Sequence, residues 1–224
     1  MKRMCLGPEG EPYMGLIKKG AEANLFLEDW HGEKIIIKKR ISKVYRIPPL
    51  DLEIRSSRTA FESQLLHDAK LAGVPTPIVF LVDLVGTSIV MQYVGGVQVK
   101  QVLNNMAKRD RIKLCRQIGK MIGRLHKKGI VHGDLTTSNM ILTSNGKVYF
   151  IDFGLGDHSE SLESRGVDLH LMKRALQSTH YKFIKECFEA VMQGYAAEVG
   201  SNNAAVVANR IQEIERRGRY VESR

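Results

Sequence analysis

Hydrophobic residues are spaced differently in the two parts of the chain. In the first part they form short β-branched or apolar runs at residues 35–37, 78–82 and 89–91, which predict strands. One stretch, residues 56–72, instead repeats apolar residues three and four positions apart and predicts a helix. The glycine pair at residues 95–96 follows the last of these strands and is the expected hinge.

Helical spacing dominates after this hinge. The expected helices span residues 99–107, 110–127, 166–178 and 181–199. A hairpin interrupts them, because apolar runs at 140–142 and 148–151 flank an Asn-Gly dipeptide, the strongest short signal for a tight turn. The pattern predicts an α+β protein with a small mostly-β lobe (residues 1–95), a reduced mostly-α lobe (96–209) and a basic C-terminal tail (210–224).

The composition is that of an ordinary globular protein, since 43% of the 224 residues are hydrophobic and 26% are charged. No apolar run approaches the roughly 20 residues of a membrane-spanning helix, and no apolar stretch follows the first cations, so we expect neither a membrane segment nor a signal peptide. The three cysteines lie far apart and give neither a disulfide framework nor a zinc site. We therefore expect a cytoplasmic protein with reduced cysteines.

The net charge of +10 favours polyanionic partners such as nucleic acid or nucleotides. Residues 108–128 contain nine cations, although helical spacing puts most of them on one face, where contact with solvent is the simpler explanation. The tail at 210–224 contains five Arg and few apolar residues. We expect it to be an extension that is ordered mainly by a partner.

Residues 131–154 contain the groups that phosphoryl transfer requires. Asp134 and Asn139 lie five residues apart in a predicted loop, and Asp152 opens an Asp-Phe-Gly sequence directly after the hairpin. The reaction needs a carboxylate that orients the attacking hydroxyl, and an amide oxygen with a second carboxylate that hold Mg²⁺. Asp134, Asn139 and Asp152 supply these groups in that order.

A cation for the phosphates is the remaining requirement. Lys38 follows the apolar run at 35–37, and Glu62 lies on the predicted helix that could place its carboxylate against this lysine. Each residue alone has an ordinary explanation: Lys38 has cationic neighbours, Glu62 fits a solvated helix face, and Asp152 fits a turn. The joint pattern, in this chain order, predicts a protein-kinase-like site.

With these motifs the sequence resembles the protein-kinase superfamily and, more narrowly, the small atypical serine/threonine kinase and ATPase subunit of the KEOPS tRNA-modification complex. The narrower resemblance spans nearly the whole chain and rests on segments that ordinary kinases lack. These segments are KKGAEA at 18–23, IKKR at 37–40, YRIP at 45–48, HGDLTTSN at 132–139, VDL at 167–169, RAL at 174–176, STH at 178–180 and RGR at 217–219.

The resemblance implies a minimal bilobal kinase fold that uses ATP and Mg²⁺. Asp134 would then be catalytic together with Lys38 and Glu62, and Asn139 and Asp152 would hold the metal. The nucleotide-binding residues that it implies are Lys38, Gly20, Glu22, Gln92, Val94, Asn139 and Asp152. It also implies a threonylcarbamoyl-transferase subunit and other KEOPS subunits as partners, with ATP turnover serving threonylcarbamoyladenosine formation in ANN-decoding tRNA.

Departures from standard kinases change the expected activity. Only Gly20 remains of a glycine-rich loop, Gly133 replaces the usual Arg, and the 70 residues after Gly154 are too few for a full peptide-docking lobe. We therefore expect an ATPase or atypical serine/threonine kinase that does not hold peptides as signalling kinases do. Three serines after the metal loop are candidate autophosphorylation sites or ordinary loop serines: Ser159, Ser161 and Ser164.

Two other functions remain open from the sequence. One is a pseudokinase scaffold that binds tRNA and the transferase subunit, favoured by the eroded glycine loop. The other is a small-molecule phosphotransferase of the aminoglycoside or choline kinase type, which the basic charge disfavours. For the tail we expect a role in tRNA binding, carried by Arg216, Arg217, Arg219 and Arg224.

Overall fold

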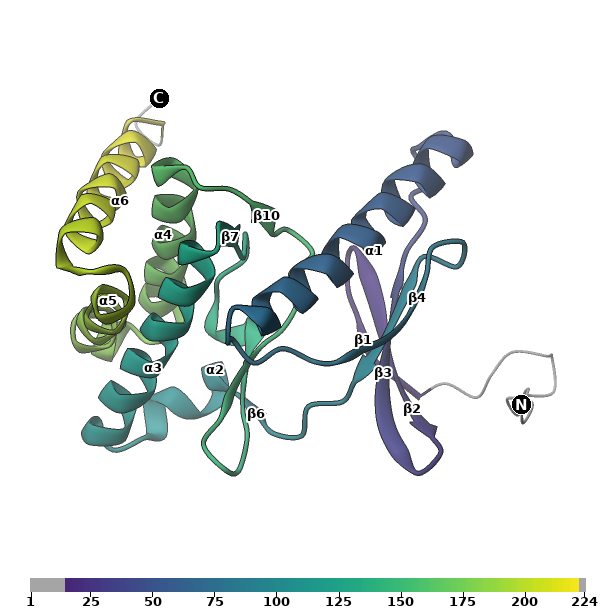
Figure 1. Ribbon diagram of the computed structural model, residues 1–224, viewed down its shortest axis with the longest axis horizontal. Coiled ribbons are helices and arrows are strands. Elements are labelled where there is room, and N and C mark those ends of the chain that lie inside the picture. Colours follow the sequence, from purple (N-terminus) through teal and green to yellow (C-terminus); the bar gives the residue numbers. More distant parts are fainter. Residues whose placement is uncertain (1–14, 222–224) are drawn as a thin grey trace. The chain divides into compact units, whose positions relative to one another are not determined.

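The computed structural model describes residues 15–221, with side chains described as far as Arg217 (Figure 1). These residues divide into two compact units. The first contains the described residues up to Gln64 together with Pro77–Tyr93, and the second contains Leu65–Thr76 and the residues from Val94 onward. Helix α1 (Pro48–Leu71) contributes residues to both. The predicted α+β class, with strands concentrated first and helices later, is confirmed.

The first unit is built on a five-stranded antiparallel sheet. Its strands, in spatial order, are β1 (Gly15–Lys19), β2 (Ala23–Trp30), β3 (Glu33–Arg40), β5 (Ser88–Gln92) and β4 (Val79–Asp83). Side chains alternate between the two faces of a strand, so Ile35 and Ile37 on β3 share one buried face. The other face of β3 carries Lys38 and Arg40, which are also buried.

Helix α1 begins at Pro48, eight residues before the expected start. Proline suits the first turn of a helix, because its fixed φ matches the helix and its missing N–H needs no partner there. Asp51 in this first turn accepts hydrogen bonds from the Ser42 hydroxyl (3.0 Å) and from Arg55 Nε (2.7 Å). The segment between β3 and α1 is therefore tied to the start of the helix.

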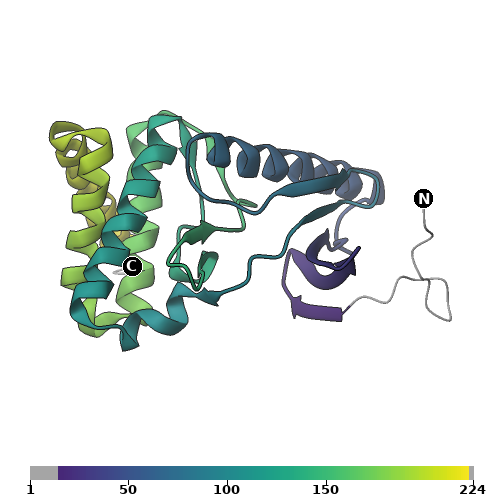
Figure 2. The same cartoon turned by 60° about the horizontal axis from the view of Figure 1, so that its bottom comes forward.

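The second unit is mostly helical, and its long helices lie side by side in both ribbon views (Figures 1 and 2). Its helices are α2 (Val99–Val102), α3 (Lys108–Lys127), α4 (Leu162–Thr179), α5 (Ile184–Val199) and α6 (Ser201–Val221), with 3₁₀ turns at Leu103–Asn105, Thr137–Asn139 and Tyr181–Phe183. Glycines on helices α3 and α5 allow the backbones of the two helices to approach closely. A Cβ on Gly119 would lie 1.9 Å from the Val191 carbonyl oxygen, and one on Gly194 would lie 2.0 Å from that of Arg116.

Helix α6 corrects the expectation for the tail. Residues 210–217 are not an extension that awaits a partner, because they continue a helix whose buried positions Ala204, Val207 and Ile211 recur every three or four residues. Arg210 of this helix pairs with Glu163 of α4 at 3.5 Å. The sequence argument missed the helix because its apolar stripe is narrow and rich in alanine and valine.

Two small sheets position the polar loops of the second unit. The hairpin of β8 (Met140–Leu142) and β9 (Val148–Phe150), confirmed as predicted, adds β6 (Val97–Gln98) along β8. Strand β7 (Ile130–Val131) pairs with β10 (Asp157–His158). Together they hold the segments on both sides of residues 132–139 and 151–156. Within residues 15–221, no helix is both long and apolar enough to cross a membrane.

Candidate phosphoryl-transfer site

The first unit holds a buried cluster of one carboxylate and two cations. Lys38 Nζ lies 2.5 Å from Glu62 Oε1, as the sequence predicts, and Arg40 Nη2 lies 2.6 Å from Glu62 Oε2. Glu62 is 1% exposed, so both of its oxygens require partners inside the protein. Within the first unit, Lys38 and Arg40 thus share the two oxygens of one buried carboxylate.

Arg40 is the member of this cluster that sequence reasoning missed. It lies two residues after Lys38 on β3, so the strand period of two puts both on the same face. Arg40 also donates to the Arg58 carbonyl oxygen of α1 at 3.1 Å. The strand periodicity is the signal that could have separated it from its exposed neighbour Lys39.

Gly20 and Glu22 lie together in the turn between β1 and β2. The Gly20 N–H donates to the Ala23 carbonyl at 3.1 Å, and a Cβ on Gly20 would approach that oxygen to 2.6 Å, so the turn requires glycine. The exposed Glu22 carboxylate pairs with Arg58 (2.8 Å) and Lys43 (3.7 Å). Glu22 therefore ties this turn to cations around the start of α1.

Gln92 and Val94 lie where the chain leaves the sheet. The Gln92 N–H donates to the Ile78 carbonyl at 2.8 Å, and its side-chain Oε1 accepts from the Ile78 N–H at 3.3 Å. The amide of Gln92 is thus used by the protein itself. Val94, which is buried, is the residue at which the chain returns to the second unit.

The second unit brings together Asp134, Asn139 and the start of the Asp-Phe-Gly segment. Asn139 Nδ2 donates to the Asp134 carboxylate at 2.7 Å and to its carbonyl at 2.9 Å. The Ile151 N–H donates to the Asn139 carbonyl at 3.0 Å, which places Asp152 immediately after a residue bonded to Asn139. Asp152 is exposed and has a φ of 64°, an uncommon left-handed conformation that aspartate tolerates better than most residues.

His132 links these two loops. Its Nδ1 accepts from the Asp134 N–H at 3.3 Å, so the proton resides on Nε2, which donates to the Ile151 carbonyl at 3.1 Å. The ring also stacks on Phe153, with centroids 4.4 Å apart. One imidazole therefore fixes Asp134 relative to the segment that carries Asp152.

Asp168 is a second residue whose role the sequence argument did not assign. Its buried carboxylate accepts the N–H groups of His132 (2.9 Å) and Gly133 (3.0 Å) and contacts His126 Nε2 at 3.2 Å. Burial alone would raise the pKa of Asp168, but the His126 hydrogen bond and charge, with His132, lower it below its usual range. The ionised carboxylate thus anchors the backbone just before Asp134.

Gly133 explains why the usual arginine is absent. Its φ is 76°, and a Cβ there would lie 1.9 Å from the Leu155 carbonyl oxygen. Any side chain would push the loop at residues 132–139 away from the segment after Gly154. The departure from the kinase pattern is therefore a packing requirement of this chain.

The donor atoms near Asp152 suit a hard cation. Asn139 donates its amide nitrogen to Asp134, which leaves its Oδ1 as an acceptor, and Asp152 adds an exposed carboxylate. Oxygen ligands of this kind, completed by water and phosphate, are those that Mg²⁺ prefers. Among the described residues no group of three or more His, Cys, Asp and Glu forms a metal site of its own.

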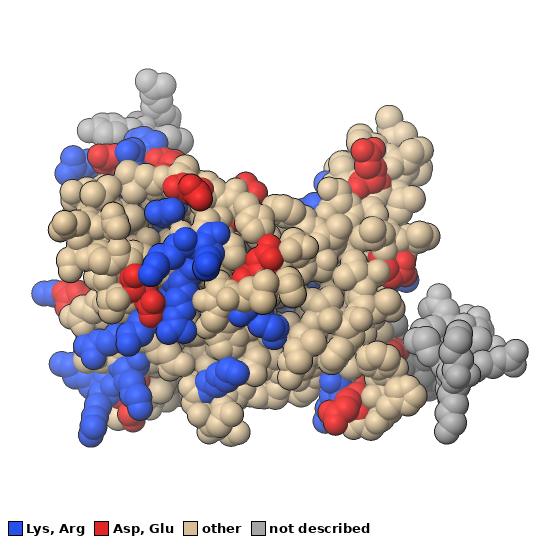
Figure 3. Space-filling model, viewed as in Figure 1, with Lys and Arg blue, Asp and Glu red and all other residues tan. Residues whose placement is uncertain are grey.

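The serines after the metal loop and the tail arginines differ in the contacts that they form. Ser161 caps α4, because its hydroxyl accepts the Ser164 N–H at 3.0 Å, which supports the structural explanation for these serines. In the tail, Arg217 pairs with Glu163 at 2.8 Å, whereas Arg216 is exposed. The side chain of Arg219 and all of Arg224 lie outside the described residues. Figure 3 shows Lys and Arg also gathered over α3.

Comparison with known proteins places the chain in a family. Residues 38–185 match the RIO domain, which defines the class. The chain is 49% identical over 215 residues to the KEOPS complex subunit Bud32 of Pyrococcus abyssi, covering 93% of this chain and 97% of that protein. It is 41% identical over 190 residues to a probable serine/threonine-protein kinase, the BUD32 homolog of Archaeoglobus fulgidus, covering 85% and 90%.

A third relative is a longer protein. The chain is 46% identical over 207 residues to a probable bifunctional tRNA threonylcarbamoyladenosine biosynthesis protein of Methanothermobacter thermautotrophicus, covering 92% of this chain but 37% of that one. The chain belongs to the RIO-domain, kinase-like family that includes the Bud32 proteins. The resemblance recognised in the motifs is thereby confirmed.

Proposed function

We propose that the protein binds ATP with Mg²⁺ and transfers the γ-phosphoryl group to water or to a serine or threonine hydroxyl. The observation that carries the proposal is the hydrogen bond between Asn139 and the Asp134 carboxylate, in a loop whose Asn139 carbonyl bonds to Ile151, the residue before Asp152. The same chain pairs Lys38 with the buried Glu62. Phosphoryl transfer depends mainly on positioning and charge, and these residues supply both.

Each residue has a defined task in this proposal. Asp134 orients the attacking oxygen and accepts its proton as the new bond to phosphorus forms and the bond to the leaving β–γ oxygen breaks. Asn139 and Asp152 offer oxygen ligands to Mg²⁺, which, when bound, neutralises phosphate charge. Lys38, held by Glu62, pairs with phosphate oxygens. Backbone groups between Gln92 and Val94, other than the N–H groups of Gln92 and Tyr93, which donate to Ile78 and Lys34, contact adenine.

The biological setting follows from the relatives. Bud32 of Pyrococcus abyssi is named as a KEOPS subunit, and the Methanothermobacter relative is named for threonylcarbamoyladenosine biosynthesis. We infer that this chain acts in a KEOPS-type complex, beside the transferase subunit, in the cytoplasm, with ATP turnover supporting that tRNA modification. Arg216 and the neighbouring tail arginines contribute phosphate contacts to tRNA.

The test is Mg²⁺-dependent ATP turnover, measured as free phosphate and as protein-bound γ-phosphate, with and without tRNA and the transferase subunit. We expect Asp152→Asn to reduce turnover by roughly 100-fold or more, because it removes a charged metal ligand. Asp157→Asn is the matched control, since Asp157 is an exposed aspartate five residues further along. The ratio of free to protein-bound label distinguishes hydrolysis from kinase activity.

A scaffold without catalysis is the alternative that this experiment tests. Wild type and Asp152→Asn would then be equally inactive under every condition, while both bind tRNA with the same salt dependence. That result would overturn the enzymatic proposal and leave the basic surface as the functional feature. Transfer to amines or sugars in place of water or protein would instead indicate a small-molecule phosphotransferase.

A further inference from the structure

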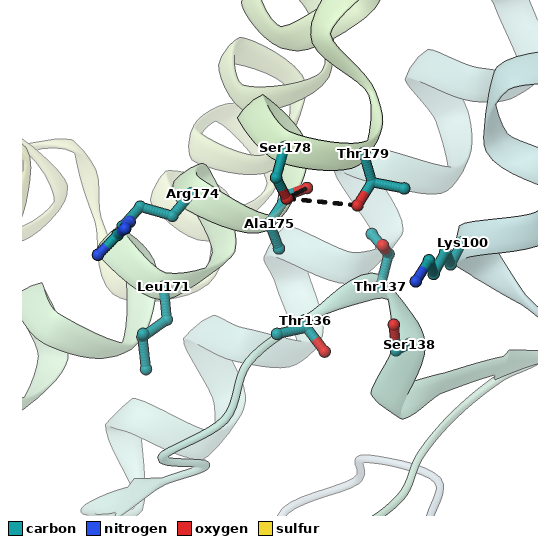
Figure 4. Close-up of a pocket in the computed structure, with 9 residues that line it drawn as sticks. All are labelled: Lys100, Thr136, Thr137, Ser138, Leu171, Arg174, Ala175, Ser178 and Thr179. Carbon is teal, nitrogen blue, oxygen red and sulfur yellow. Dashed lines mark hydrogen bonds between the residues drawn. The ribbon is translucent and has the colours of Figure 1, made fainter.

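A pocket of about 360 Å³ in the second unit lies on the α4 side of the 3₁₀ turn after Asp134 (Figure 4). Its lining combines two cations and several hydroxyls with the apolar side chains of Leu171 and Ala175. The residues are Lys100, Thr136, Thr137, Ser138, Leu171, Arg174, Ala175, Ser178 and Thr179. We call it the Lys100–Arg174 pocket, after the two cations that lie on either side of it in Figure 4.

The charge of this pocket is uncompensated. Neither cation forms an ion pair with any side chain described between residues 15 and 217, and no carboxylate is among the lining residues. Both cations are exposed at the rim. Elsewhere in this unit some cations do pair with acids, as the exposed Arg217 does with Glu163 and the half-buried Lys173 with Glu215. The pocket therefore concentrates positive charge in a concave site.

The wall formed by the 3₁₀ turn is fixed in place by two hydrogen bonds. Gln98 Nε2 donates to the Ser138 carbonyl at 2.9 Å, and the Thr137 hydroxyl lies 3.1 Å from His180 Nε2. Because Asn104 donates its amide nitrogen to the Thr179 carbonyl, its Oδ1 faces His180 Nδ1 at 2.7 Å and must accept a proton from it. His180 Nε2 then accepts the Thr137 proton.

Burial, with the nearby charge of Lys100, lowers the pKa of His180, which keeps the ring neutral and this arrangement intact at neutral pH. The hydroxyls of Thr136 and Ser138 form no hydrogen bond with the side chains or backbone described in the structure, and Thr179 has only a long contact to Ser178 (3.4 Å). Three hydroxyls with available protons and two cations thus line one preformed cavity.

We propose that the Lys100–Arg174 pocket binds a phosphate group, either as inorganic phosphate or on a small phosphomonoester. Cations and neutral hydroxyl donors in a concave site match a compact dianion, and charge-assisted hydrogen bonds to phosphate are among the strongest available to a protein. A polynucleotide backbone calls for cations arranged along a track, whereas these two flank a single cavity. The inference goes beyond the proposed ATP site, none of whose assigned residues lines this pocket.

The experiment follows backbone amide resonances of ¹⁵N-labelled protein during titration with sodium phosphate, at an ionic strength held constant with sodium chloride. We expect saturable shifts at residues 136–138 and 178–179. Lys100→Gln and Arg174→Gln should each weaken the apparent affinity about tenfold, equivalent to about 1.4 kcal/mol. Lys113→Gln, an exposed cation on α3, is the matched control and should bind as wild type does.

Titrations with other ligands identify which phosphate compound binds and which results would contradict the proposal. Saturable binding of both phosphate and O-phosphoserine identifies a site for phosphomonoesters in general, and binding of phosphate alone identifies an inorganic phosphate site. Shifts confined to residues 35–39, or unchanged affinity in both variants, would overturn the proposal. So would a single-stranded oligoribonucleotide that shifts the pocket amides when phosphate and phosphoserine do not. Because both substitutions are at the exposed rim, a dispersed wild-type-like spectrum verifies that each variant is folded.

Discussion

The candidate site residues of the two units are positioned by different kinds of interaction. In the first unit, Lys38 and Arg40 are positioned by side-chain contacts to one carboxylate, Glu62. In the second, the loop at residues 132–139 is positioned by backbone N–H groups that bond to Asp168, and by a glycine that leaves no room for a side chain. The first arrangement depends on charge, whereas the second depends on backbone shape. The two should therefore fail under different perturbations.

The largest effect is expected from adding one methyl group to the second unit. Gly133→Ala would place a Cβ 1.9 Å from the Leu155 carbonyl oxygen in a backbone conformation that disfavours alanine. We expect a loss of about 3 kcal/mol in the free energy of unfolding, measured by denaturant titration, with loss of ATP turnover. Gly15→Ala, where the added Cβ meets only an ordinary contact, is the control. Equal stability of the two variants would contradict the shape argument.

An intermediate effect is expected in the first unit. Arg40→Met removes the second cation from Glu62, which is then free to shift and to draw Lys38 away from the phosphates. We expect kcat for ATP turnover to fall on the order of tenfold, as small displacements of positioning groups do. Lys39→Met, the exposed neighbour on the same strand, should keep full turnover.

A conservative variant separates positioning from simple loss of structure in the same cluster. Arg40→Lys retains the charge and should recover part of kcat. If Arg40→Lys and Arg40→Met were equally impaired while both unfold as the wild type does, charge on Glu62 would not be the determining property. Charge would then not be what positions Lys38 and Arg40 in the first unit.

The smallest effect is expected from pH. The pKa of His180 is lowered in the folded protein, so its contribution to stability is fully present above the ordinary histidine pKa near 6.5 and is lost as pH falls through the lower folded value. We expect His180→Gln to flatten the decline in unfolding free energy between pH 7.5 and 5, measured by denaturant titration at each pH. The control is His158→Gln, at an exposed histidine. In this variant, replacing His180 should still flatten the pH dependence of the unfolding free energy by the same amount.

Much of this architecture followed from local patterns. The β-branched run at 35–37 and the Asn-Gly turn predict the strand before Lys38 and the hairpin before Asp152. The helix predicted after Lys38 could place the Glu62 carboxylate against this lysine, as the structure shows. Those predictions depend on neighbouring residues or on a known motif. The contacts that the sequence did not reveal join distant segments: Asp168 to His132, Tyr195 to His126, and Arg40 to Glu62.

The tail is another case in which a contact between distant segments could not be predicted from the sequence. Basic composition predicted an extension, but helix α6 packs Ile211 and holds Arg217 against Glu163, more than 50 residues earlier. No local property of residues 210–217 identifies that partner. Composition describes a segment in isolation, and the packing of a helix depends on the surface that another element presents.

The glycine contact between α3 and α5 has a consequence for how this chain tolerates change. A slip of α5 by one residue would bring Gln193 or Tyr195 to the place of Gly194, where a Cβ meets the Arg116 carbonyl. The two helices therefore have a single permitted register, set by backbone atoms, whatever the length of the segment between them. Insertions in loops between α3 and α5 therefore leave the packing of these two helices unchanged, because Gly119 and Gly194 fix it through backbone atoms.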